Sequence, residues 1–364
     1  MHQSKIASRA LLGLSLTLVA CSDEDPALAP VVIGNSCNVV QVAADIETPT
    51  TWKSGNVYVI SQDLFVEDVL TIEPGVIVKA DGARIVTLAD GRIEAQGTAN
   101  AHIIFTSIAD DSCCGDTNKN GAATMAQKGD WTGIYLNGGD DHVFRYCDIL
   151  YAGKDRGGYR NAVLVSQAGS AFEFDHCTMA HTATGNSAGA YAFYGGFHMQ
   201  DNQISRFTNN VFYDNDRPIL CDSNYTLNTS NVFHNPSDAS QTNKRNGIFL
   251  LDSAKNDWVT QWDITEVPYV LSDFNQGGLD NMLILGANVV VKFTHPGSGL
   301  LFQETRPIEA HSTVILTSYK DDEHGGDTNG DGNATSPAHG DWDGVFYSLT
   351  NEYLEHENIL YDSH

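Results

Sequence analysis

The chain has 364 residues and is strongly acidic, with 46 Asp and Glu against 20 Lys and Arg and a formal net charge of −26. This charge argues against nucleic acid as a partner, because binding to phosphates requires a basic surface that displaces counterions. It favours divalent cations instead. The length suffices for one elongated domain or two compact ones.

Residues 1–20 have the features of a secretory signal peptide. Lys5 and Arg9 form a short basic region, and the apolar run that follows is too short to cross a bilayer as a mature helix. The run ends in Leu-Val-Ala-Cys at Cys21, which resembles the lipobox of bacterial lipoproteins. That resemblance implies cleavage before Cys21 and acylation of its thiol. The alternative is an ordinary signal peptide with a chance cysteine.

Residues 21–49 are expected to form a flexible, lipid-anchored tether, because the segment after Cys21 is polar and interrupted by proline. Ser22 resembles the outer-membrane sorting preference of lipoproteins, and the acidic residues after it resemble surface-export signals. We therefore expect an outer-membrane protein displayed at the cell surface. No second apolar span follows, so the membrane is expected as a partner only through the anchor.

A long-range repeat divides the rest of the chain into two modules. Thr106–Gly133 aligns without a gap with Thr317–Gly344, at an offset of 211 residues. Both copies contain Gly-Asp-Thr-Asn, then a glycine, then Gly-Asp-Trp. We assign residues 50–256 to the first module and residues 257–364 to a shortened, partial repeat of it.

Short β-branched and aromatic runs recur between the two acidic segments, separated by clusters of Gly, Asn and Asp. They share a position that holds Cys147, Cys177, Asn210 or Asn231. Coils of short strands that stack at about 4.8 Å produce such a pattern, because like residues then form ladders. The pattern predicts an all-β parallel solenoid. A β-sandwich is the alternative and would show cleaner alternation and Asn-Gly hairpin turns.

Four segments resemble the right-handed parallel β-helix repeat proteins of bacterial surfaces: Leu70–Lys79, Gly97–Ser107, Tyr146–Gly153 and Asp321–Val345. The resemblance covers most of residues 50–215 and 265–361. It implies a right-handed parallel β-helix at the cell surface and no particular activity. The chain departs from the repeat pattern at Cys113-Cys114, where the second copy has His324-Gly325, and in lacking later coils after the second copy.

The second acidic segment is built like the first half of a calcium loop. Asp327, Asn329 and Asp331 alternate, and Gly332 permits the sharp turn that points their oxygens inward. The bidentate Glu of an EF-hand is missing, because Ala338 stands in its place. We therefore expect weak Ca²⁺ binding, with a dissociation constant of about 10⁻⁴–10⁻³ M. The remaining ligands are expected among three further carboxylates: Asp321, Asp322 and Asp341.

The first acidic segment offers less negative charge, and Lys119 lies within it. Weaker Ca²⁺ binding or none is expected there. Its candidate ligands are Asp110, Asp111, Asp116, Asn118, Asn120 and Asp130. For both segments the alternative is a network of Asx turns, in which Asp and Asn side chains cap their own backbone.

The tryptophans of Gly-Asp-Trp, Trp131 and Trp342, are expected to cover the coil where each acidic loop rejoins a strand. A sugar-stacking role is the alternative. Cys147 and Cys177 are expected to be buried thiols, with a disulfide between adjacent coils as the alternative. The absence of a C-x-x-C pair argues against zinc. The pairing of the other cysteines is left open: Cys37, Cys113, Cys114 and Cys221.

The expected function is a non-enzymatic one in adhesion, contact with a polysaccharide or surface scaffolding. The alternative is a polysaccharide lyase or hydrolase of the pectate-lyase-like β-helix class. Its catalytic candidates lie in turn-like loops, where solvated surface charge is the other interpretation: Lys154, Asp155, Arg156, Asp214, Asp216 and Arg217. An exposed aromatic stripe at Ala190–Phe197 would favour binding, whereas a buried one would favour a spacer.

Overall fold

The computed structural model describes residues 37–88, 90–165, 171–183, 185, 190–196, 205–251, 259–271, 282–302 and 308–364. The predicted signal peptide, Cys21 and the first part of the predicted tether lie outside these ranges. The regular elements of the described residues are all β-strands, as the sequence predicted. None of the described segments forms a helix long and apolar enough to cross a membrane.

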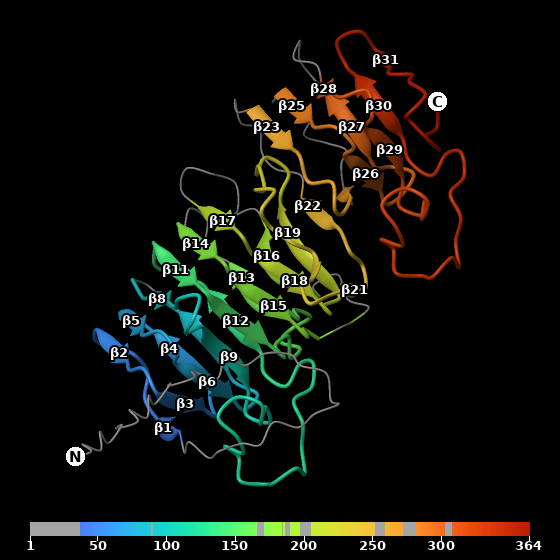
Figure 1. Ribbon diagram of the computed structural model, residues 1–364. Coiled ribbons are helices and arrows are strands. Elements are labelled where there is room, and N and C mark those ends of the chain that lie inside the picture. The colour runs from blue at the N-terminus through green and yellow to red at the C-terminus, as the bar shows by residue number, and fades with distance from the viewer. Residues whose placement is uncertain are drawn as a thin grey trace, which may run out of the picture.

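Three parallel sheets enclose the core of the first module (Figure 1). The first sheet contains β2 (Thr50–Trp52), β5 (Val69–Ile72), β8 (Arg92–Gln96), β11 (His142–Arg145), β14 (Phe172–Asp175) and β17 (Arg206–Thr208). The second contains β1 (Asn38–Val42), β3 (Asn56–Ile60), β6 (Ile77–Ala80), β9 (Ile103–Ser107), β12 (Cys147–Leu150), β15 (Thr178–Ala180) and β18 (Val211–Tyr213). The third begins with β4 (Leu64–Val66), β7 (Arg84–Thr87), β10 (Gly133–Leu136), β13 (Val163–Val165), β16 (Tyr191–Gly196) and β19 (Arg217–Asp222).

Successive strands of the chain visit the three sheets in turn, so that β2, β3 and β4 make one coil and β5, β6 and β7 make the next. Strands in neighbouring coils pair in parallel and in register. This is the arrangement of a parallel solenoid. Strand β1 lies within the stretch expected as a tether and pairs with β3, so regular structure begins before residue 50.

The third sheet runs through both modules, but the second module joins it with its strands displaced by one sheet. The sheet continues with β22 (Ile248–Leu251), β24 (Tyr269–Leu271), β26 (Val290–Phe293) and β29 (Ile315–Ser318). By the sequence repeat β29 corresponds to β9, which lies in the second sheet. The displacement follows the antiparallel hairpin of β20 (His234–Asn235) and β21 (Asp238–Thr242).

Two short sheets complete the coils of the second module. One contains β23 (Val259–Trp262), β25 (Met282–Leu285) and β28 (Glu309–Ala310). The other contains β27 (Gly299–Phe302), β30 (Gly344–Tyr347) and β31 (Glu352–Tyr353), of which β31 is antiparallel. One cluster of buried hydrophobic side chains runs through both modules, so the repeat adds coils to a shared core.

Ladders of like side chains hold the coils together inside. The Phe144 and Phe174 rings stack at 4.5 Å between centroids. The Asn210 Oδ1 atom accepts from the Cys177 N–H at 3.0 Å, and Asn231 Oδ1 accepts from the Asn210 N–H at 3.0 Å. The predicted ladder is therefore present. An Asn at this position satisfies two buried polar groups of adjacent coils, which a smaller apolar residue cannot do.

The cysteines follow the sequence prediction where one was made. Cys147 and Cys177 are buried thiols and do not form a bridge. Cys37 forms a disulfide with Cys114, with a Cα–Cα distance of 5.8 Å. This bond fastens the start of β1 to the first acidic loop, across a sequence separation of 77 residues.

The tryptophans of both Gly-Asp-Trp motifs are core residues. Trp131 and Trp342 are buried, and their indole N–H groups donate to Leu150 O and Leu360 O, each at 2.7 Å. The sugar-stacking alternative is therefore wrong. Tyr191 and Phe193 of the candidate aromatic stripe are also buried, whereas Phe197 lies outside the described residues.

Candidate functional site

The two acidic segments form long loops that leave the solenoid on the same side (Figure 1). The first loop connects β9 to β10, and the second connects β29 to β30. Their equivalent residues make equivalent contacts, so each loop can be described from its base to its tip. The second loop carries the fuller set of carboxylates.

A buried lysine lies at the base of each loop. Lys79 of β6 donates to Asp110 O at 2.7 Å and to Gly115 O at 3.0 Å. Lys292 of β26 donates to the equivalent carbonyls, Asp321 O at 2.7 Å and Gly326 O at 2.6 Å. Each ammonium group therefore links two backbone carbonyls at the base of its loop, in the position that a bound cation could take.

Burial sets the proton affinity of these lysines. It lowers the pKa of Lys292 to about 8, against the attraction of nearby carboxylates led by Asp321, and it lowers the pKa of Lys79 in the same way. The sequence analysis missed both residues. The signal was a lysine at the same place in two aligned apolar strands, where an inward-facing charge is unusual.

Four of the predicted ligands brace the loops instead of gathering at the tips. Asp321 accepts from Thr317 Oγ1 at 2.6 Å, and Asp341 accepts from Ser318 Oγ at 2.7 Å and from Lys320 Nζ at 2.6 Å. The first copy repeats this bracing with the bonds of Thr106 to Asp110 and of Ser107 to Asp130, each at 2.6 Å. These carboxylates are committed to the base of the loop, away from the tip.

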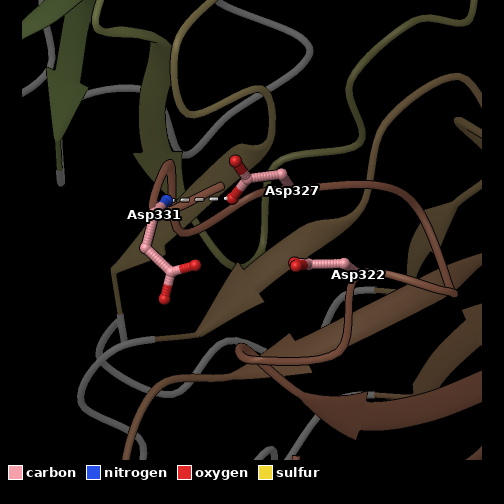
Figure 2. Close-up of side chains that lie close together, drawn as sticks. All are labelled: Asp322, Asp327 and Asp331. Carbon is pink, nitrogen blue, oxygen red and sulfur yellow. Dashed lines mark hydrogen bonds between the residues drawn. The ribbon is translucent and has the colours of Figure 1, made fainter. Parts of the chain in front are cut away.

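At the tip, the second loop folds into the network of Asx turns that the sequence offered as an alternative. Asp327 accepts from the N–H of Asp331 at 3.1 Å (Figure 2). It also accepts from the N–H of Gly332 at 2.8 Å. Asn329 Oδ1 accepts from the Asp331 N–H at 2.9 Å. Gly332 has a φ of +64°, which a residue with a side chain adopts only at a cost.

The Asp331 Oδ1 atom accepts from the Ala334 N–H, and its Oδ2 atom accepts from the N–H and hydroxyl of Thr335 and from the Asn329 amide. Both carboxylates are thus held in place, and each oxygen of Asp327 keeps a further lone pair.

Three carboxylates converge at this tip (Figure 2). One oxygen each from Asp322, Asp327 and Asp331 lies within 4.8 Å of the other two. Oxygens that bind one Ca²⁺ at about 2.3–2.6 Å lie no more than about 5 Å apart, so these three fit a shared ion. In the part of the chain that the structure describes, no other group of three or more His, Cys, Asp or Glu residues comes together in this way.

Asp322 has the least favourable environment of the three carboxylates. Its Oδ1 atom is buried, and no described residue gives it a hydrogen bond. Burial first, and the neighbouring Asp327 charge second, raise the pKa of Asp322. A half-buried carboxylate with one unsatisfied oxygen beside two like charges is a position that a divalent cation would stabilise.

The first loop has the same arrangement with one carboxylate fewer. Asp111 Oδ1 is also buried without a hydrogen bond from any described residue, and burial followed by the Asp116 charge raises the pKa of Asp111. Asn120 takes the place of Asp331, and its amide donates to Thr124 Oγ1 at 2.7 Å. Asn118 donates to the same hydroxyl at 3.3 Å. The predicted difference between the loops therefore has a structural counterpart.

The catalytic candidates of the lyase alternative come from two loops, one after β12 and the other after β18. Lys154, Asp155 and Arg156 are exposed, as expected for solvated surface charge. That interpretation is wrong for Asp216, which is buried and whose two oxygens each accept from Arg245 of the next coil at 2.6 Å.

Arg217 is likewise no free surface charge, because its guanidinium lies 5.1 Å from the centres of the Tyr191 and Phe249 rings. Asp214 forms hydrogen bonds with a histidine and a lysine, His181 and Lys128.

Comparison with known proteins yields no matching family model, no matching curated protein and no matching solved structure. The chemistry of the loops is therefore argued from their own residues.

Proposed function

We propose that this protein is a non-enzymatic, right-handed parallel β-helix of the bacterial cell surface, stiffened by Ca²⁺ at its second acidic loop. It is anchored in the outer membrane by a lipid on Cys21 and acts in adhesion, glycan contact or scaffolding. The observation that carries the proposal is the Asp322–Asp327–Asp331 cluster, with its buried, unsatisfied Asp322 oxygen. The right-handed coil is supported by the general handedness of parallel strand crossovers, about 98% of which are right-handed.

Calcium would join two parts of the loop that the backbone does not hold together. Asp322 directly follows Asp321, whose carbonyl is bound by Lys292 at the base, whereas Asp327 and Asp331 belong to the turn at the tip. The ion would replace repulsion among the three carboxylates by attraction to a shared charge. Because backbone N–H groups already orient Asp327 and Asp331, binding would need little reordering of the turn.

Thermal unfolding of the mature protein with Ca²⁺ and with chelator tests this proposal. For a dissociation constant of about 10⁻⁴–10⁻³ M, about 10 mM Ca²⁺ should stabilise the fold by roughly 1.4–2.7 kcal/mol. The isosteric variant Asp322→Asn should lose most of this stabilisation. The matched first-loop variant Asp111→Asn should keep it, because the second loop has the additional carboxylate.

The double variant Asp327→Asn, Asp331→Asn retains oxygen acceptors for the turn while removing two charges. If it shows the same Ca²⁺-dependent shift as the wild type, the assigned site is wrong. Mg²⁺ at the same concentration is expected to stabilise less, because it demands octahedral geometry and gives up its water reluctantly.

The non-enzymatic part of the proposal has its own test. Pectate, alginate and chondroitin would be incubated with the protein, with and without Ca²⁺, while the ultraviolet absorbance of unsaturated uronates is followed. A flat trace is expected, because Arg156 and Asp216 of the lyase candidates are occupied in ion pairs. A Ca²⁺-dependent rise in absorbance would replace the proposal with the lyase alternative.

A further inference from the structure

A polar groove of about 960 Å³ lies between the two acidic loops. Lys128, from the end of the first loop, and Gly325–Asp327 of the second loop contribute to its lining. Residues 240–242 of the hairpin β20–β21 also line it. The groove thus exists because the second module and the hairpin bring the two loops to one side of the solenoid.

The base of the groove is rigid and already satisfied. Asn215 Nδ2 donates to Asn243 Oδ1 and to Met179 O, both at 2.8 Å. Asn243 Nδ2 in turn donates to Phe212 O at 3.0 Å. These buried asparagines form a ladder between coils, so the base offers a fixed surface whose hydrogen bonds are used inside the protein.

The charges of the groove cancel. Lys128 Nζ donates to Asp214 Oδ1 at 2.5 Å, and His181 Nδ1 lies 2.7 Å from Asp214 Oδ2. Burial tends to raise the pKa of Asp214, but the hydrogen bonds of His181 and Lys128 outweigh it and lower that pKa. Lys244 and Asp327 add one positive and one negative formal charge to the lining. The lining is therefore neutral in a chain of net charge −26.

The other groups that reach the groove are hydroxyls, amides and glycine backbone, from Ser240, Gln241, Thr242, Asn246 and Gly325-Gly326. Aliphatic, Phe, Tyr and Trp side chains are absent from the described lining. An apolar ligand would desolvate these polar groups without replacing their hydrogen bonds. A polyanion would meet the acidic field of the whole chain. A ligand rich in uncharged hydroxyls both donates and accepts, and therefore matches the lining.

We propose that this groove is a binding site for an uncharged oligosaccharide. The inference rests on the glycan-contact part of the proposed function and names its site and ligand class. A volume of this size accommodates a ligand of several sugar rings. Asp327 belongs to both the groove and the carboxylate cluster, so Ca²⁺ at the second loop would fix one side of the groove.

Isothermal titration with neutral hexasaccharides of glucose, mannose and xylose, and with a uronate hexasaccharide, tests the inference. The variant Thr242→Trp places a large ring in the groove at an exposed position. Thr51→Trp is the matched control, at an exposed position of β2. Saturable binding of a neutral hexasaccharide is expected, weakened at least about tenfold by Thr242→Trp and changed less than about twofold by Thr51→Trp.

Three results would overturn the inference: no neutral hexasaccharide saturates the protein below about 10 mM, the uronate binds more tightly, or Thr242→Trp leaves binding intact. The Ca²⁺-dependent melting shift is measured on the same samples. If that shift persists while sugar binding is absent, only the groove assignment fails. If sugar binds while the shift is absent, the calcium proposal fails and the groove stands.

Discussion

Acidification should destabilise the first module through one buried imidazole, that of His142. This side chain is fully buried on β11. Its Nδ1 atom accepts from the Ile93 N–H at 3.3 Å, and its Nε2 atom lies 3.0 Å from Gly138 O. Because Ile93 N–H can only donate, the proton of the neutral ring belongs on Nε2. A second proton would go to Nδ1, where it would break the Ile93 bond and bury a charge.

Burial lowers the pKa of His142 from 6.5 to about 4 in the folded protein. The unfolded chain therefore binds more protons than the folded chain between these two pH values, and acid favours unfolding. The stabilising contribution of neutral His142 is complete above pH 6.5 and is lost as the pH falls toward 4. The full loss amounts to about 3 kcal/mol, since one pKa unit corresponds to about 1.4 kcal/mol.

Urea unfolding at pH 7 and pH 4.5, for the wild type and His142→Gln, measures this contribution. The amide of Gln offers one donor and one acceptor but does not titrate. The variant should be less stable at pH 7 and should lose about 2 kcal/mol less than the wild type on acidification. Carboxylates titrate equally in both proteins and cancel in the comparison. Equal pH dependence of the two proteins would refute this account of His142.

Three further outcomes concern the loops. Lys292→Met removes the ammonium donor to the carbonyls of Asp321 and Gly326, although Gly326 O keeps the Thr328 N–H at 2.8 Å. We expect the free energy of unfolding to fall by about 2 kcal/mol and hydrogen exchange over residues 321–332 to become faster, with exposed Lys53→Met as an unaffected control. Cys37→Ser opens the disulfide to Cys114, which spans 77 residues, and should lower the free energy of unfolding by about 4 kcal/mol, measured by urea unfolding. A loss under about 1 kcal/mol would contradict this. Reductant, which opens the disulfide, should accelerate hydrogen exchange only in the first loop. Chelator, which removes Ca²⁺, should accelerate it only in the second loop. Acceleration of both loops by either reagent would contradict the assignment of the disulfide to one loop and of Ca²⁺ to the other.

The solenoid could be predicted from the residues that make contacts between neighbouring coils. Asn210 and Asn231 occupy equivalent positions because each side chain forms hydrogen bonds with backbone groups of the neighbouring coil. That requirement makes Asn recur at this position in the sequence. The displacement of the second module by one sheet leaves no such mark. It appears in the strands that follow the hairpin β20–β21, and β9 and β29 keep similar sequences although they lie in different sheets.

The candidate site was predictable to the same extent. Asp327 and Asp331 lie in one turn, so their spacing along the chain determines their approach. Asp321 and Asp322 are adjacent in sequence and differ in role, because Asp321 faces the base of the loop and accepts from Thr317, while Asp322 joins the tip. Lys292 comes from another strand, and only the packing of β26 beneath the loop shows its role.

The two loops differ in a way that links the disulfide to the carboxylate cluster. Cys114 has a φ of +57°, in the left-handed region that Gly325 occupies at +78° in the second loop. A side chain at such a φ is disfavoured, so the bond to Cys37 contributes a constraint that offsets the cost. The first loop, with Asn120, lacks the third carboxylate but has this covalent link, whereas the second loop has Asp331 and no cysteine. With Ca²⁺ bound as we propose, each loop would have one fastening beyond its buried lysine, and the two fastenings would respond to different reagents.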